Sequence, residues 1–398
     1  MASRREVHSD MSRPAFLQAL QGLFPELETL KHGDTLARLL ERIEPQKLEE
    51  SFVRLLRRYI RNKKFKHYLI NNCYPIAIDG TQKLVRDGEL WGEQWLERHV
   101  ETNHYEKTQQ FVYVLEANLV FSNGLTIPLY CSFLSYNEDD SEQVKQDCEL
   151  KAFKRLSHKL KKYFPRLQII LLLDGLYANG PVMDLCKEYN WEYMIVLQNK
   201  CLPEVWKKFE ELKPKQNHNE LSNIYKREQH FYWVNGIHYS YDNKGVLISV
   251  VVCDSIWQEV DPNTEEILDK KSRHVWISSR FLEKNHVLEL CNDGARYRWG
   301  IENSINTDSL RGYCYEHPFL YNFNAWLSYH YLMRMAHALN ALALNNKQGA
   351  KFVRQMGIRP FLKFVRETLS GLWLDIQWMA DLLTKPFQLR LESLQTAN

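Results

Sequence analysis

Two short apolar runs, far apart in the chain, are each followed by the pair Asp-Gly. Ile76–Ile78 precedes Asp79-Gly80, and Leu167–Leu173 precedes Asp174-Gly175. Continuous apolar runs of this length are typical of strands covered on both faces, at the centre of a sheet. We expect the two strands to be neighbours, with both aspartates at the sheet edge where open α/β folds bind ligands. The simpler interpretation, that each Asp-Gly only makes a turn, stays open.

The segments around these runs alternate between helical and strand-like patterns. Apolar positions repeat with helical spacing in 48–60 and 141–163, and the strand-like runs 111–121 and 125–134 are joined at a turn. A helix-like segment at 181–189 leads to another apolar run at 193–197. Because strand–helix–strand order implies parallel pairing, the predicted fold class is α/β, a mixed sheet flanked by helices.

The segment 200–285 is rich in β-branched and aromatic residues, and it contains Asn235-Gly236, a strong hairpin signal. A helix is predicted over 292–310, and the chain beyond 319 has a helical pattern. Five regions follow from these changes of character. They are a helical, candidate DNA-binding region at 1–70, the first part of the core at 71–199, a β-rich insertion at 200–285, the rest of the core at 286–345, and a helical region at 346–398.

Composition adds a possible partner. The chain has 398 residues and is 44% hydrophobic and 13% aromatic, which indicates a globular protein of two or three domains. Its net charge is only +3, but 51–67 and 151–166 each carry seven Lys or Arg and no acid. Such stripes suit a polyanion such as DNA, although solvated helix faces explain them equally well. The candidate DNA contacts are Arg57, Arg58, Arg61, Lys154 and Lys159.

The cysteines indicate the compartment. None of the eight forms a Cys-x-x-Cys pair, so a zinc site of the usual spacing is not expected. Together with the lack of a secretory signal, this predicts a reducing, intracellular environment. No apolar run is long enough to span a bilayer, so no membrane partner is expected.

A third acid occurs on the predicted helix 292–310. Glu302 is four residues after Arg298, so the two share a helix face, and a surface ion pair is the simplest interpretation. If Glu302 instead joins Asp79 and Asp174, three carboxylates would suit two Mg²⁺ or Mn²⁺ ions, roughly 3.5–4 Å apart, at a phosphoryl-transfer site.

Several fragments in this order resemble the Asp-Asp-Glu (DDE) transposases of bacterial insertion sequences, in the cut-and-paste branch whose core is RNase H-like. The resemblance covers most of the chain. The matching segments are 32–36, 43–45, 77–81, 144–156, 171–177, 298–303, 312–313 and 316–317.

The resemblance implies that Asp79, Asp174 and Glu302 are the catalytic, metal-binding triad. It implies that 200–285 is the insertion that such enzymes carry between the second Asp and the Glu, where Trp257 or Trp276 could hold a flipped base. Core tryptophans are the simpler interpretation of both. Arg298 would contact DNA phosphate.

One part of the family pattern is absent: Ala295 and Ser309 occupy the positions of its signature Tyr and Lys. Whether a hairpin intermediate is used is therefore open. The implied function is cleavage at the ends of a mobile element and strand transfer into target DNA. The partners would be the terminal inverted repeats, the target duplex and a second copy of the chain, in the bacterial cytoplasm at the nucleoid. The alternatives are a metal-dependent nuclease of the same fold and a catalytically silent DNA-binding descendant.

Overall fold

The structure is a computed structural model that describes residues 8–9, 11–87, 96–102, 105–134, 145–224, 226–261, 265–310, 313, 315–316, 322–371, 380–381 and 384. The chain divides into two compact units. The larger is Leu39–Asn345, and the smaller combines Met1–Arg38 with Asn346–Asn398. These units divide the chain differently from the five regions expected from the sequence, because a single large sheet unites the middle of the chain.

The smaller unit is helical where it is described. It contains α2 (Pro14–Gln21), α11 (Lys347–Met356) and α12 (Ile358–Ser370), and α12 packs against α2. The helix α3 (Gly33–Arg42) begins in this unit and ends in the larger one. A helical pattern was predicted for both terminal regions, and it is seen in these elements.

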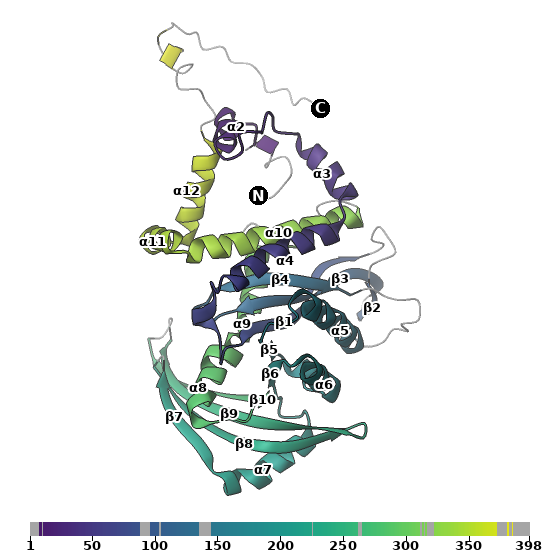
Figure 1. Ribbon diagram of the computed structural model, residues 1–398, viewed down its shortest axis with the longest axis vertical. Helices are drawn as coiled ribbons and strands as arrows, with labels where there is room; N and C mark the ends of the chain where they lie inside the picture. The colour runs from purple at the N-terminus through teal and green to yellow at the C-terminus, as the bar shows by residue number, and fades with distance from the viewer. Residues whose placement is uncertain are drawn as a thin grey trace. The chain divides into compact units, whose positions relative to one another are not determined.

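The larger unit is built on one mixed sheet (Figure 1). Its order is β2-β3-β1-β5-β6-β10-β9-β8-β7, and β4 also pairs with β3. The pairs β1/β5 and β5/β6 are parallel, and the others are antiparallel. The strands are β1 (Tyr74–Asp87), β2 (Leu96–Thr102), β3 (Tyr105–Val120), β4 (Thr126–Phe133), β5 (Ile169–Leu173), β6 (Glu192–Val196), β7 (His218–Ile224), β8 (Arg227–Tyr241), β9 (Lys244–Val260) and β10 (Ile267–Ser278).

Helices cover both faces of this sheet. In chain order they are α4 (Pro45–Arg61), η1 (Lys66–Tyr68), α5 (Lys145–Tyr163), η2 (Gly175–Tyr177), α6 (Gly180–Tyr189), α7 (Pro203–Gln216), α8 (Lys284–Leu288), η3 (Glu289–Gly294), η4 (Ala295–Arg298), α9 (Trp299–Leu310) and α10 (Phe323–Asn345). The predicted α/β class, a mixed sheet flanked by helices, is therefore confirmed.

The alternation of side chains along β1 assigns the helices to faces. Ile76 and Ile78 lie in the apolar cluster that contains Phe52 of α4 and Phe153 of α5. Ala77, which points the other way, lies in the cluster that contains residues of η3, η4 and α9. Helices α4, α5 and α6 thus pack on one face of the central strands and η4 and α9 on the other, as Figure 1 also shows for α5, α6 and α9.

The β-rich segment does not fold apart from the core, since β10 pairs with β6 and continues the central sheet. The hairpin predicted at Asn235-Gly236 is wrong: β8 runs through it with a bulge, and Gly236 has φ +71°. The Asn235 side chain is buried and exchanges hydrogen bonds with the backbone of Leu282. The chain turns instead at Asp242 and Asn243, which both have positive φ. Gly236 therefore adopts its positive φ in a bulge and not in a turn, while the Asn235 side chain makes its hydrogen bonds inside the protein.

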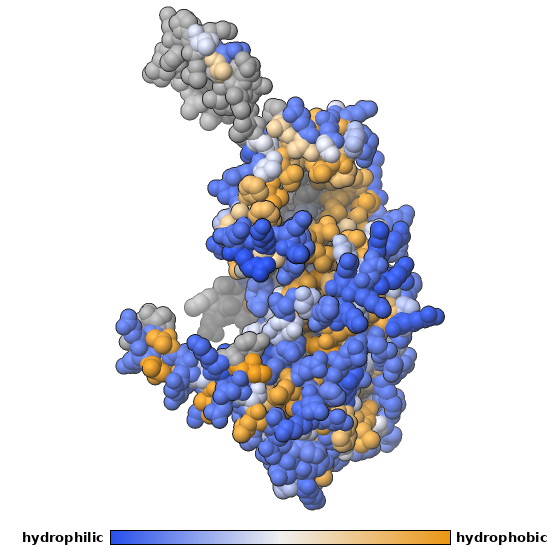
Figure 2. Space-filling view, turned by 60° about the vertical axis from the view of Figure 1, so that its left-hand side comes forward, coloured by the Kyte–Doolittle hydropathy of each residue, from blue (hydrophilic) through white to orange (hydrophobic). Residues whose placement is uncertain are grey.

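Figure 2 shows one face of the molecule, on which hydrophilic residues predominate and hydrophobic ones form separate patches. The longest described helix, α10, buries His330, Arg334 and His337 along its length. Among the described residues, no helix combines the length and the apolar character that crossing a membrane requires.

Candidate active site

Asp79 and Asp174 are brought together by the parallel pairing of β1 and β5. Ala77 lies opposite Leu172, so Asp79 and Asp174 are each two residues further along their strands. Both aspartates follow the side-chain direction of Ala77 and Leu172, toward the face that η4 and α9 cover. The expectation that the two strands are neighbours is confirmed. The expectation that the first strand ends at Asp79 is wrong, because β1 continues to Asp87.

Glu302, on α9, is linked to Asp79 by the Arg298 side chain, which lies near both carboxylates. Arg298 Nη2 donates to Glu302 Oε1 at 2.8 Å, and Arg298 Nη1 lies 3.6 Å from Asp79 Oδ2. The helix predicted over 292–310 is interrupted: a π-helical segment, η3, and a 3₁₀ turn, η4, precede α9. Arg298 is the last residue of η4 and its side chain is only 11% exposed, so the pair is not the surface ion pair that spacing alone suggests.

The electrostatics of Asp79 follow from this convergence. The pKa of Asp79 is raised to about 6 by the balance of several causes. Burial is the largest and raises it, as do the negative charges of Asp174 and Glu302, while Arg298 and the Gly80 N–H lower it. The Gly80 N–H donates to Asp79 Oδ1 at 3.0 Å, and the Leu176 N–H donates to Asp174 Oδ1 at 2.9 Å. This group of acids, when ionised, is therefore short of positive charge, which favours the approach of a cation.

The donor set fits a divalent metal by its chemistry, because three carboxylates supply the hard oxygen ligands that Mg²⁺ and Mn²⁺ prefer. Within the described ranges, however, no group of three or more His, Cys, Asp and Glu side chains is arranged to hold a metal ion. Glu302 is turned to Arg298, and Asp79 shares the same guanidinium. The Arg298 guanidinium thus balances part of the charge of Asp79 and Glu302.

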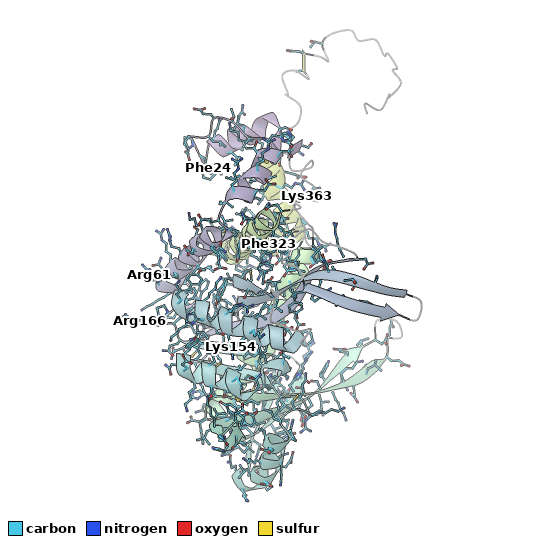
Figure 3. All side chains as sticks on the ribbon, turned by 90° about the vertical axis from the view of Figure 1, so that its right-hand side faces the viewer. Phe24, Arg61, Lys154, Arg166, Phe323 and Lys363 are labelled. Atoms are coloured by element: carbon cyan, nitrogen blue, oxygen red, sulfur yellow. The ribbon has the colours of Figure 1, made fainter. Side chains whose placement is uncertain are left out.

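The predicted DNA contacts on helices lie on the opposite face of the sheet from Arg298. Arg57, Arg58 and Arg61 are exposed on α4, and Lys154 is exposed on α5. Figure 3 shows Arg61, Lys154 and Arg166 along one side of the molecule. Both stripes therefore belong to one layer of helices.

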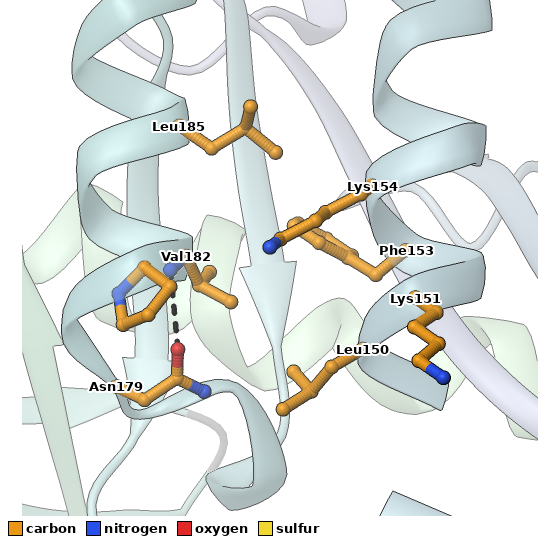
Figure 4. A pocket seen from close by; sticks show the side chains of 8 residues that line it. Leu150, Lys151, Phe153, Lys154, Asn179, Val182 and Leu185 are labelled. Carbon is orange, nitrogen blue, oxygen red and sulfur yellow. Dashed lines mark hydrogen bonds between the residues drawn. The ribbon is translucent and has the colours of Figure 1, made fainter. Parts of the chain in front are cut away.

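Lys159 differs from the other stripe residues. Its Nζ lies 3.1 Å from Oε1 of Glu49, whose side chain is 1% exposed, so this lysine ties α5 to α4. Lys154 instead extends over a pocket of about 360 Å³ between α5 and α6, whose floor includes Phe153, Val182 and Leu185 (Figure 4). The pocket is lined by these two helices and by none of the three acids.

The two candidate tryptophans have different environments. Trp276 is 3% exposed in the apolar core and stacks on His274, so its ring is not presented at the surface. Trp257 is half-buried on β9, donates from Nε1 to Glu259 Oε1 at 2.7 Å, and has the Arg227 guanidinium 4.2 Å from its ring centre. Of the two, only Trp257 offers a ring face at the surface.

A second polar cluster was missed from the sequence. Arg334 of α10 donates to Asp308 Oδ2 of α9 at 2.7 Å and also pairs with Glu116 of β3. His337 Nδ1 lies 2.6 Å from Asp308 Oδ1, and Lys83 Nζ donates to His330 Nδ1 at 2.8 Å. The only sequence signal was the presence of charged residues inside apolar stretches.

A pair beside Asp79 was also missed. Tyr113 of β3 donates from its hydroxyl to Glu149 Oε1 of α5 at 2.5 Å. Glu149 lies within 144–156, one of the segments that carries the family resemblance, so that motif marked the residue without indicating its contact.

No protein-family model matches the chain, and a search of curated protein sequences finds no match either. Function therefore has to be inferred from the residues and their geometry.

Proposed function

We propose that the protein is a DDE transposase with an RNase H-like core, which cleaves DNA at the ends of its own mobile element and joins them to target DNA. The observation that carries this proposal is the convergence of Asp79 on β1, Asp174 directly after β5, and Glu302 on α9. Asp79 and Glu302 share the Arg298 guanidinium, and the charges of Asp174 and Glu302 both act on Asp79. Surface acids brought together by chance would not include an Asp that is largely buried among like charges.

The topology supports the same proposal. The strand order is β4-β3-β1-β5-β6, with β3 antiparallel to β1 and β4, and with β5 and β6 parallel to β1, which is the order we expect for the proposed RNase H-like core. In such a core, acids at the ends of the central strands meet a third acid from a later helix. The strands β7 to β10 then correspond to the insertion between the second Asp and the Glu.

The chemistry assigns a task to each residue. Asp79 and Asp174 present oxygen ligands from adjacent strands, and Glu302 presents a third from the helix that closes over them. A divalent metal bound there would activate the attacking water or 3′-hydroxyl and stabilise the leaving oxygen. Arg298, whose planar guanidinium suits a pair of phosphate oxygens, binds and orients the phosphate beside the acids. Phosphates distant from the reacting bond are bound by the exposed cations Arg57, Arg58, Arg61 and Lys154.

The reaction has two parts. In cleavage, the oxygen of a water molecule attacks phosphorus and the bond to the 3′ oxygen breaks, which frees a 3′-hydroxyl. In joining, that hydroxyl attacks a target phosphodiester and releases a target 3′-hydroxyl. Because two ends are joined together, a dimer of the chain on DNA is the expected working form.

The test uses the purified full chain, Mg²⁺ or Mn²⁺, and a labelled duplex made from the DNA that flanks its own gene. We expect nicks at the element ends and joined products. Asp79→Asn, Asp174→Asn and Glu302→Gln should each abolish cleavage and leave DNA binding largely intact.

The matched control is Asp269→Asn, which neutralises an exposed acid on β10 and should cleave like the wild type. Cleavage that survives one of the three site substitutions removes that residue from the triad. Nicks without joined products favour the plain nuclease, and binding without any cleavage favours the silent descendant.

A further inference from the structure

Gly80, the residue after Asp79, leaves the space that an aromatic ring occupies. Since β1 continues past it, this glycine does not make the turn that Asp-Gly suggested. A Cβ at Gly80 would lie 2.6 Å from the Tyr113 hydroxyl oxygen and 2.7 Å from its ring atom Cε1. The Tyr113 ring therefore lies directly against the Gly80 backbone, and only glycine leaves room for it. The N–H of this same residue donates to the Asp79 carboxylate.

Tyr113 is itself fixed from the other side. Its hydroxyl donates to Glu149 Oε1 at 2.5 Å, and Glu149 is only 5% exposed. Glu149 lies on α5, which Phe153, Leu156 and Leu160 anchor to the sheet. A continuous line of contacts thus runs from a packed helix through a tyrosine to the peptide that holds Asp79.

Such a support has a physical purpose at this point. Glycine loses more conformational freedom on folding than other residues, so a glycine in a strand next to a functional carboxylate is a local soft point. A ring packed on its backbone restricts that freedom. Because Glu149 Oε1 accepts the hydrogen bond of the Tyr113 hydroxyl, Glu149 also fixes the direction of that hydroxyl.

We propose that Tyr113 and Glu149 are positioning residues for Asp79: they hold the Gly80 peptide so that the Asp79 carboxylate faces Asp174 and Glu302. The inference rests on the proposed function in one respect, that these acids form a metal-dependent site. Neither residue touches DNA or metal in this role. They act through Gly80.

The experiment compares two single-hydroxyl deletions in the full chain. Tyr113→Phe removes the bond to Glu149. The matched control Tyr130→Phe removes the hydroxyl that donates to the Leu156 carbonyl of the same helix. Tyr130 is on β4, and its hydroxyl bonds to α5 and not toward Gly80, so a purely structural tie predicts the same behaviour for both variants.

We expect Tyr113→Phe to weaken Mn²⁺ binding by the metal-free protein about tenfold. It should also lower kcat for DNA cleavage by about tenfold to a hundredfold and leave KM for DNA unchanged, because misplaced reacting groups lower the rate and not the affinity for DNA. Tyr130→Phe should change neither quantity. Glu149→Gln keeps an acceptor oxygen for the hydroxyl, so it should retain most of the Mn²⁺ affinity and kcat that Glu149→Ala loses. Thermal unfolding of each variant shows that the folded state is retained.

The outcomes separate the two proposals. If Tyr113→Phe behaves like Tyr130→Phe in Mn²⁺ affinity and kcat, the positioning role is overturned while the proposed function stands. If the wild type binds Mn²⁺ without cleaving DNA and Tyr113→Phe weakens that binding, the positioning role is supported and the proposed function fails. If the wild type neither binds Mn²⁺ nor cleaves DNA, both proposals are overturned.

Discussion

Asp79 and Glu116 are direct partners across the β1–β3 ladder, yet they have opposite surroundings. Glu116 is completely buried, and it pairs with Arg334 and accepts a hydrogen bond from the Tyr315 hydroxyl at 2.5 Å. The side chain of Asp79 is 20% exposed, and it shares Arg298 with Glu302. One carboxylate belongs to a dry, internally paired network, and its neighbour belongs to an open group of acids.

The difference separates a charge that the fold requires from one that we propose to be functional. Removing one partner of a buried ion pair leaves an uncompensated charge, so the fold requires the network around Glu116 to stay intact. The acids around Asp79 repel one another, and burial disfavours the ionised form of Asp79. A site that is unfavourable for its own charges is suited to a cation that arrives later.

The largest expected effect comes from neutralising each member of the ladder pair. Glu116→Gln should lower the free energy of unfolding of the metal-free protein by roughly 3–5 kcal/mol, because Arg334 and Lys83 lose a buried counter-charge. Asp79→Asn should leave that free energy unchanged or raise it, because it removes a repelled charge. Urea unfolding in EDTA measures both. Equal destabilisation by the two substitutions would contradict the comparison.

The second prediction concerns Lys83, on the network side. Burial lowers the pKa of Lys83 to about 7, against the opposing charges of Glu116 and Asp308. The unfolded state then binds more protons above pH 7, so the free energy of unfolding should rise by about 2 kcal/mol between pH 7 and 9. The groups that face Lys83 are Glu116, Cys131, Asp308, Tyr315, His330 and Arg334.

Lys83→Met should remove this rise while the other groups that titrate remain, so the measurement is the difference between variant and wild type across the pH range. A wild-type stability that falls over the same range, with the variant parallel to it, would place a charged lysine in the network.

The smallest effect is expected at Arg298, on the site side. Arg298→Gln should tighten Mn²⁺ binding by the DNA-free protein about tenfold, or about 1.4 kcal/mol, since the metal no longer competes with a guanidinium for Asp79 and Glu302. Cleavage should fall at the same time, because the variant loses the phosphate contact that we propose for Arg298. Isothermal titration measures the first effect and single-turnover cleavage the second.

Arg296→Gln is the matched control for that experiment. Arg296 is two residues away and donates to Ser255 Oγ at 3.0 Å, away from the acids. It should leave Mn²⁺ affinity unchanged. Weaker Mn²⁺ binding by Arg298→Gln would mean that the arginine supports the metal site and does not compete with it.

Parts of the fold could be predicted because they are encoded locally. The apolar runs at 76–78 and 167–173 became the adjacent parallel strands β1 and β5, and the runs at 111–121 and 125–134 became the antiparallel pair β3 and β4. Other signals misled, since Asp79-Gly80 and Asn235-Gly236 look like turns and lie within strands. A glycine in the sequence indicates only that a position needs space or a positive φ. The residue that packs into that space lies elsewhere in the chain and cannot be identified from the glycine itself.

The candidate site divides in the same way. Their positions after apolar runs drew attention to Asp79 and Asp174, and the resemblance to DDE transposases selected Glu302 and Arg298. Neither of these signals could single out Glu149, whose hydroxyl partner is 36 residues away, or the Glu116–Arg334 pair, which joins β3 to α10.

By itself, the sequence of this protein determined where apolar strands and amphipathic helices form and which acids follow the central apolar runs, because periodicity and strand order act over short stretches of chain. Only the tertiary structure decided which charges pair in the dry interior and which gather as partly exposed acids around Asp79. Those choices depend on contacts between residues up to about two hundred positions apart, such as the Glu116–Tyr315 bond, whose partners are 199 residues apart. Burial then fixes the cost of each charge, and the local sequence does not show which charged side chains are buried.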